Sequence, residues 1–244
     1  MTPPSLEHRL AARERPPGSQ VMYQSWTHLL FLHWRWDAAD LQKRLPPGLT
    51  VDTFDGSAWL GVVPFFMRNI RPRFVPSMPW FSNFLEKNVR TYVHDEQGRP
   101  GVWFFSLDCN QPFAVWTART FFHLPYQHSR MKARIADEWT VHYTNHRHGD
   151  TVASAFRYTL SKETTLAEPG TLEFFLVERY LLFASSPQGL RIGRVYHPPY
   201  PIARAEATEF DTRILKLNDF SEPGTPPDHV CGSPGVNVLI YPLQ

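Results

Sequence analysis

Residues 86–109 read EKNVRTYVHDEQGRPGVWFFSLDC, and this stretch predicts the unit from which the fold is built. The ranges 88–94 and 102–109 are rich in β-branched and aromatic residues, which favour strands, and the polar, glycine-containing range 95–101 lies between them. Two strands that follow each other through a short turn pair antiparallel. We therefore expect an antiparallel hairpin here.

The same pattern recurs on both sides of this hairpin. The further hairpins are 51–54 with 59–66 around Asp55-Gly56, and 139–148 with 152–160 around Gly149-Asp150. Strands and helices do not alternate along the chain, so a parallel sheet is not expected. The predicted fold class is α+β, mainly antiparallel β.

A long strand and two helices complete the predicted elements. Residues 22–36 are dense in apolar side chains with a period of two, as in a half-buried strand, and Asp37 is a good N-cap for a helix at 38–45. The range 70–80 has no periodicity and predicts a long loop. A second helix begins at Pro112. Its expected buried stripe consists of Phe113, Trp116, Ala118 and Phe121.

The composition indicates one folded domain. The chain has 244 residues, of which 42% are hydrophobic and 14% aromatic, which is enough for a packed core. Residues 1–20 contain arginines and prolines but no apolar run, so we interpret them as an N-terminal tail and not as a secretory signal. The single domain is expected at 21–244.

Charge and hydropathy argue against two classes of partner. The 25 basic and 23 acidic residues give a net charge of +2 without a basic stripe, so nucleic acid is not an expected partner. The apolar runs fall short of the roughly 20 residues that a membrane helix needs, so no membrane contact is expected. Two cysteines make no disulfide framework or zinc motif, which favours the reducing cytoplasm.

Two groups of polar residues are candidates for a binding site. Glu86 and Arg90 share one strand face with Asn88, and this face is either exposed to solvent or lines a pocket. Glu178 and Tyr180 lie within a long apolar stretch, so a charge buried there needs a partner. Networks of this kind are structural at least as often as they are catalytic.

A third group consists of histidines. His142, His146 and His148 share one strand face and could hold a metal, whereas solvated hairpin histidines are the simpler interpretation. A fourth ligand is missing, so we expect no metal. The chain has no phosphate loop, dinucleotide fingerprint, HExxH or GxSxG motif, which argues against the enzyme classes that depend on them.

Five motifs occur together in one order. They are Asn88-Val89-Arg90-Thr91-Tyr92-Val93, Phe104-Phe105-Ser106-Leu107-Asp108, Arg119 with Leu124-Pro125-Tyr126, Glu178-Arg179-Tyr180, and His197-Pro198-Pro199-Tyr200-Pro201. With them the chain resembles the YqjF-like bacterial family of unknown function, which is similar to acetoacetate decarboxylase. The resemblance implies a cone or barrel of antiparallel strands with a few flanking helices around an apolar pocket. It places Glu86 near an active-site carboxylate.

The resemblance also identifies a departure in chemistry. Acetoacetate decarboxylase has adjacent lysines directly after the proline that corresponds to Pro125, and one of them forms an imine with the substrate. Tyr126 and Gln127 stand at these positions here, and neither side chain can form an imine. Lys132 comes too late to be assumed equivalent. We therefore expect no imine-forming decarboxylase and no cofactor.

The expected site residues follow from the resemblance. Glu86 is the candidate base and Tyr126 the candidate proton donor, although Tyr126 could also simply pack. The substrate-binding candidates are Arg90, Arg119, Glu178 and Tyr180. Two functions stay open: an enzyme of lyase, isomerase or hydratase type that acts on a carbonyl or carboxylate compound, and a non-catalytic module that binds or senses a small molecule. Homo-oligomerisation stays open as well.

Overall fold

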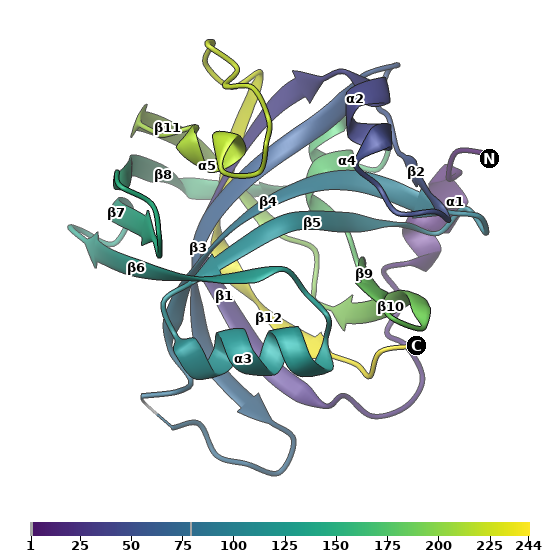
Figure 1. Ribbon diagram of the computed structural model, residues 1–244, viewed down its shortest axis with the longest axis horizontal. Helices are drawn as coiled ribbons and strands as arrows, with labels where there is room; N and C mark the ends of the chain where they lie inside the picture. Colours follow the sequence, from purple (N-terminus) through teal and green to yellow (C-terminus); the bar gives the residue numbers. More distant parts are fainter. Residues whose placement is uncertain (1, 79) are drawn as a thin grey trace.

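The computed structural model describes residues 2–78 and 80–244, which form a strand-rich molecule with short helices (Figure 1). Over these ranges twelve strands make one sheet: β1 Met22–Trp36, β2 Leu49–Val51, β3 Ala58–Pro72, β4 Phe84–Asp95, β5 Pro100–Cys109, β6 Tyr126–Ile135, β7 Thr140–Arg147, β8 Ser154–Leu166, β9 Leu181–Ser186, β10 Gly189–Tyr196, β11 Pro201–Glu209 and β12 His229–Ile240. The helices are α1 Leu6–Ala11, α2 Ala38–Lys43, α3 Pro112–Phe121, α4 Leu172–Val177 and α5 Arg213–Lys216. In the described ranges no helix is long and apolar enough to cross a membrane. The fold class is α+β and mainly antiparallel, as predicted.

The sheet closes on itself twice through a shared wall of the strands β12, β1, β3, β4 and β5. Pairing of β4 with β5 closes one ring through β6, β7, β8 and β11, and pairing of β10 with β12 closes a second ring through β9. The two sets of strands lie on opposite sides of the wall (Figure 1). The parallel contacts are short registers of β5 with β6 and with β9, which the hairpin pattern does not predict.

The shared wall has a hydrophobic core on each face. On one face, Leu29 and Phe31 of β1 pack in a cluster with helix α4, and we call this the α4 side. On the other face, Leu30 and Trp34 pack with residues of β7, β8 and α5, and we call this the β7 side. A strand covered on both faces needs apolar residues at successive positions, which explains the continuous apolar run in β1.

The central hairpin forms as predicted, with β4 antiparallel to β5, and so does the pair of β7 with β8. The hairpin expected around Asp55-Gly56 is only partly correct. The turn exists, with φ of 46° at Asp55 and 75° at Gly56, but it closes only a single bridge between Phe54 and Ser57. The short strand β2 pairs with β4 and not with β3. Both edges of β3 already have partners, β1 on one side and β4 on the other.

Both predicted helices form, but the buried stripe of the second is wrong. Asp37 caps α2 by accepting a hydrogen bond from the backbone of Asp40, and Gln111 caps α3 just before Pro112. In α3 only Val115 is buried, whereas three residues of the expected stripe are exposed: Phe113, Trp116 and Phe121. Apolar residues surround α3 on more than one face, so spacing alone could not identify the buried face.

The N-terminal segment is integrated into the fold. In α1, Arg9 donates two hydrogen bonds of 2.8 Å to the carboxylate of buried Asp52. After the helix, Arg13 makes an ion pair of 3.1 Å with the carboxylate of buried Glu178. Buried carboxylates need such partners, so residues expected to form a tail supply contacts to the folded domain.

Candidate functional site

The candidate site begins on the α4 face of β4. Successive side chains of a strand point to opposite faces, so Glu86, Asn88 and Arg90 share the α4 side, while Lys87 points to the β7 side. Glu86 lies in register with Phe65 of β3 and Cys109 of β5, and only 3% of its surface is exposed. The strand face is therefore buried and not a solvated surface.

Glu86 and Tyr126 are in direct contact. The phenol of Tyr126 donates a hydrogen bond of 2.6 Å to the Glu86 carboxyl group. The Tyr143 hydroxyl donates to the backbone carbonyl of Glu86 at 2.9 Å. Tyr126 is the first residue of β6, and the turn after α3 brings it beside the end of β5. The two catalytic candidates thus form one buried pair.

Burial changes the proton affinity of both members of this pair. Loss of solvent raises the pKa of Glu86 from its ordinary 4.5 to about 7, against the opposing effect of the hydrogen bonds from Tyr126 and Asn88. Burial, followed by the charge of Glu86, raises the pKa of the Tyr126 phenol well above its ordinary value. Near neutral pH, Glu86 can therefore take up and release a proton while Tyr126 keeps its own.

Arg90 and Asn88 carry polar atoms without partners on the same face. The Arg90 guanidinium lies 5.3 Å from the ring centre of Phe31 and donates one hydrogen bond of 3.3 Å to the backbone carbonyl of Leu176 in α4. Its Nε and the side-chain oxygen of Asn88 are buried and have no hydrogen-bond partner among the described residues. Buried polar atoms normally have partners, so these two atoms are suited to a ligand.

Glu178 and Tyr180 form a second cluster beside α4. The Tyr180 hydroxyl donates a hydrogen bond to the Glu178 carboxylate, which also accepts from the backbone amide of Tyr200 at 3.0 Å. The Tyr180 ring stacks on His197 with 4.5 Å between the ring centres. Together with Arg13, these contacts satisfy the Glu178 carboxylate with donors from the protein itself.

Arg119 lies apart from the other candidates. It is exposed on α3 and lines a surface depression of about 500 Å³ with Trp103, Phe104, Leu124 and Pro125. Neither Glu86 nor Tyr126 lines this depression. Arg119 thus shares this depression with Leu124 and Pro125 and not with the Glu86–Tyr126 pair.

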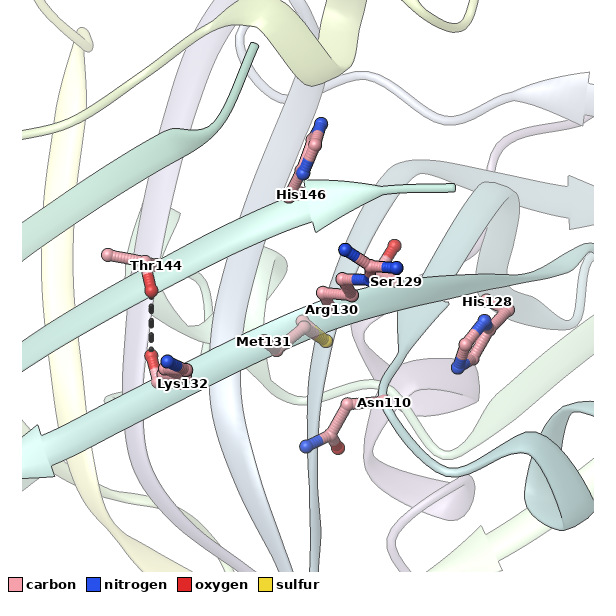
Figure 2. A pocket seen from close by; sticks show the side chains of 8 residues that line it. All are labelled: Asn110, His128, Ser129, Arg130, Met131, Lys132, Thr144 and His146. Carbon is pink, nitrogen blue, oxygen red and sulfur yellow. Dashed lines mark hydrogen bonds between the residues drawn. The ribbon is translucent and has the colours of Figure 1, made fainter. Parts of the chain in front are cut away.

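A second surface depression, also of about 500 Å³, lies along β6 and β7. Figure 2 shows that His128, Arg130 and Lys132 follow one another along β6, with His146 of β7 nearby. The lining contains no carboxylate. We call this feature the basic depression. Lys132 is exposed here and lies outside the buried Glu86–Tyr126 contact.

Lys87 is the residue that sequence reasoning missed. It is completely buried on the β7 side, with its ammonium group 5.2 Å from the ring centre of Phe156 and without a hydrogen-bond partner among the described residues. Burial lowers its pKa to about 8, against the attraction of Asp108. No local pattern in the sequence identifies it, because lysine is seldom fully buried.

The histidine group does not form a metal centre in the part of the chain that the structure describes. There, no three histidine, cysteine or acidic side chains lie close enough together to hold an ion. His146 instead hydrogen-bonds to the backbone carbonyl of Asp150 at 2.9 Å.

Comparison with known proteins gives the relationships of the chain. The sequence model of the family DUF2071, described as an uncharacterized conserved protein, matches residues 23–237. The uncharacterized protein YqjF of Bacillus subtilis (strain 168) is 38% identical over 232 residues, which is 94% of each chain.

Solved structures of low sequence identity share the fold. The enduracididine biosynthesis enzyme MppR complexed with pyruvate gives a TM-score of 0.61 at 14% identity, over 95% of this chain and 92% of that one. An acetoacetate decarboxylase-like enzyme from Sphingomonas wittichii RW1 gives 0.61 at 15%, over 100% and 96%. Acetoacetate decarboxylase from Legionella pneumophila gives 0.61 at 12%, over 99% and 96%. The fold is thus that of the acetoacetate decarboxylase-like proteins, and the chain belongs to the DUF2071 family.

Proposed function

We propose that this protein is an enzyme that acts on a small carbonyl or carboxylate compound by proton transfer, without an imine. The observation that carries the proposal is the buried Glu86 carboxyl group, whose pKa of about 7 is matched to acid–base work at neutral pH and which contacts the Tyr126 phenol at 2.6 Å.

The chemistry follows from the two pKa shifts. In its ionised form, Glu86 would take a proton from the carbon next to a carbonyl group; the electron pair of that C–H bond would form a carbon–carbon double bond, and the π electrons of the carbonyl group would move onto its oxygen. The Tyr126 phenol stays protonated because burial raises its pKa, and its single O–H, which donates to Glu86 in the unliganded structure, would turn to this oxygen when the substrate binds. Protonated Glu86 then returns the proton to a carbon atom. This series of proton transfers needs no primary amine.

Arg90 gives the proposed substrate its second feature, a negative charge. A guanidinium group matches the geometry of a carboxylate, and the unpartnered Nε of Arg90 leaves a donor for one. Glu86 and Arg90 are four residues apart, which is roughly 13 Å along a strand. This spacing favours an oxo acid longer than pyruvate. The structural neighbour MppR is described in complex with pyruvate, which is a 2-oxo acid.

The test is exchange of hydrogen for deuterium at the carbon next to the carbonyl of unbranched 2-oxo and 3-oxo acids, followed by proton NMR in D₂O. We expect the protein to accelerate exchange by about 10²- to 10⁴-fold, the usual contribution of general acid–base catalysis. The Glu86→Gln variant should lose the acceleration, and exposed Glu163→Gln is the matched control. Acceleration that survives in Glu86→Gln would refute the proposed role.

A non-catalytic binding or sensing module is the second candidate. The hydrogen bond that Tyr126 donates to Glu86 favours this candidate, since such a pair can have a purely structural role. Calorimetric titration with the same acids separates the two. A binding module should bind an acid without accelerating exchange, and Arg90→Met should abolish binding while Arg119→Met should not.

A further inference from the structure

The molecule has a cluster of exposed aromatic side chains on two neighbouring segments, the loop residues 73–78 and 80–83 and helix α3. We call it the aromatic surface, and its members are Phe74, Trp80, Phe81, Phe113, Trp116 and Phe121. Trp80 is 86% exposed and Trp116 is 55% exposed. Phe81 contacts Phe113 at 5.8 Å between ring centres, and the Gln111 side chain donates to the backbone carbonyl of Trp80, so the loop and the helix lie side by side (Figure 1).

The two stretches of chain that carry the aromatic surface contain charged residues of one sign only. The ranges 57–85 and 109–136, which contain the loop and the helix, have no aspartate or glutamate. These two ranges contain seven basic residues. The rest of the chain contains the other 18 of the 25 basic residues and all 23 acidic residues. The seven are Arg68, Arg71, Arg73, Arg119, Arg130, Lys132 and Arg134. A small net charge thus conceals a strong local excess of positive charge.

The basic depression adjoins the aromatic surface. Asn110 lines the depression, and the next residue, Gln111, contacts Trp80. Figure 2 shows Asn110 beside strand β6, below the row formed by His128, Arg130 and Lys132. Exposed aromatic residues therefore lie next to a hollow with donors that suit a phosphate group: Arg130 and Lys132, with His128 beside them.

We propose that this combined surface docks the protein on an anionic lipid membrane. Exposed Trp and Phe side chains insert at the level of the lipid headgroups, while the basic side chains bind the anionic headgroups. Val75 and Met78 are also exposed in the loop, and such side chains fit the apolar part of a bilayer but cannot stack on bases as single-stranded nucleic acid requires. Peripheral docking of this kind needs no spanning helix.

The charge also argues against a second copy of this chain as the partner. A two-fold interface places the same patch of both subunits face to face. The absence of acidic residues in both ranges would then bring the cations of one copy against those of the other without compensation. An anionic lipid surface supplies the complementary charge.

The experiment is sedimentation of the full chain with vesicles of phosphatidylcholine alone or mixed with phosphatidylserine. We expect binding to the mixed vesicles that weakens as salt is added. The double variant Arg130→Gln/Lys132→Gln should weaken binding by about 25-fold, from about fivefold for each cation near an anionic surface. Its matched control is Lys162→Gln/Arg204→Gln, which removes two exposed cations from the strands β8 and β11 and should bind as the wild type does.

The aromatic contribution has its own variant. Trp80→Ser/Trp116→Ser should lose binding, whereas Leu166→Ser, at a residue that is 62% exposed on β8, should not. Brominated phosphatidylcholine in the mixed vesicles should quench tryptophan fluorescence of the wild type, which tests insertion without any substitution. Equal binding to neutral and mixed vesicles would overturn the proposal. Two other outcomes would also overturn it. One is that the protein does not bind vesicles but forms a dimer that the Trp116→Ser substitution dissociates. The other is that it binds a single-stranded oligonucleotide and not vesicles.

Discussion

Replacing Glu86 by glutamine should make the protein more stable at alkaline pH. The Glu86 pKa rises from 4.5 to about 7 on folding, so the folded state binds the proton more tightly than the unfolded state does. Stability is therefore greatest below pH 4.5 with respect to this group, and it falls as the pH rises to about 7. At 1.36 kcal/mol for each pH unit, the ionised carboxylate destabilises the fold by about 3 kcal/mol above pH 7.

Glutamine keeps the shape of the side chain and an acceptor for the Tyr126 phenol but removes the titration. Urea unfolding of wild type and Glu86→Gln at about pH 5 and about pH 8.5 measures the difference. The free energies of unfolding should be similar at the lower pH and should differ by up to about 3 kcal/mol in favour of the variant at the higher pH. Exposed Glu163→Gln should show no such trend. A difference that does not change with pH would refute the assignment of the raised pKa to Glu86.

Three further predictions concern the lysine amines, the histidines and the buried ion pair of Asp52 with Arg179. Borohydride treatment in the presence of acetoacetate should give no reduced adduct in the intact mass, because Tyr126 and Gln127 replace the family lysines; an adduct mapped to Lys87 or Lys132, with release of carbon dioxide, would contradict this. Elemental analysis of protein purified without a histidine tag should find no stoichiometric zinc, and zinc that disappears in His146→Ala would contradict this. Asp52→Ala should destabilise the fold by about 3–5 kcal/mol in urea unfolding, because it leaves the buried Arg179 guanidinium without its 2.8 Å partner; a loss below about 1 kcal/mol would show that the pair adds little.

The sequence predicts elements well where the pattern is local. The hairpin of β4 and β5 and the Asp37 cap depend on residues close together in the chain, and both form. The pairing of β2 with β4 and the parallel contact of β5 with β6 depend on distant residues that compete for an edge, and local patterns carry no information about that competition. Strand β6 was not predicted at all, because its alternating charged residues resemble a polar connection.

The candidate site shows the same division. Strand periodicity alone places Glu86 and Arg90 on one face, and the structure adds that this face is buried. The contact of Tyr126 with Glu86 joins residues 40 apart and could be expected only through the family resemblance. The same resemblance names Arg119, which the structure places on exposed helix α3 in the lining of a surface depression. Lys87 was overlooked because burial on the second face of the wall depends on strands β7 and β8.

The pairing of β1 with β12 determines when the molecule can finish folding during synthesis. The two strands pair from Met22 with Ile240 to His33 with His229, so one edge of β1 has no partner until β12 has emerged from the ribosome. At about 5–20 residues per second, this interval is roughly 10–40 s. Throughout it, the apolar run at 29–34 lies along an open strand edge, which is the kind of surface that aggregates. Newly made chains should therefore depend on chaperones until β12 closes both rings.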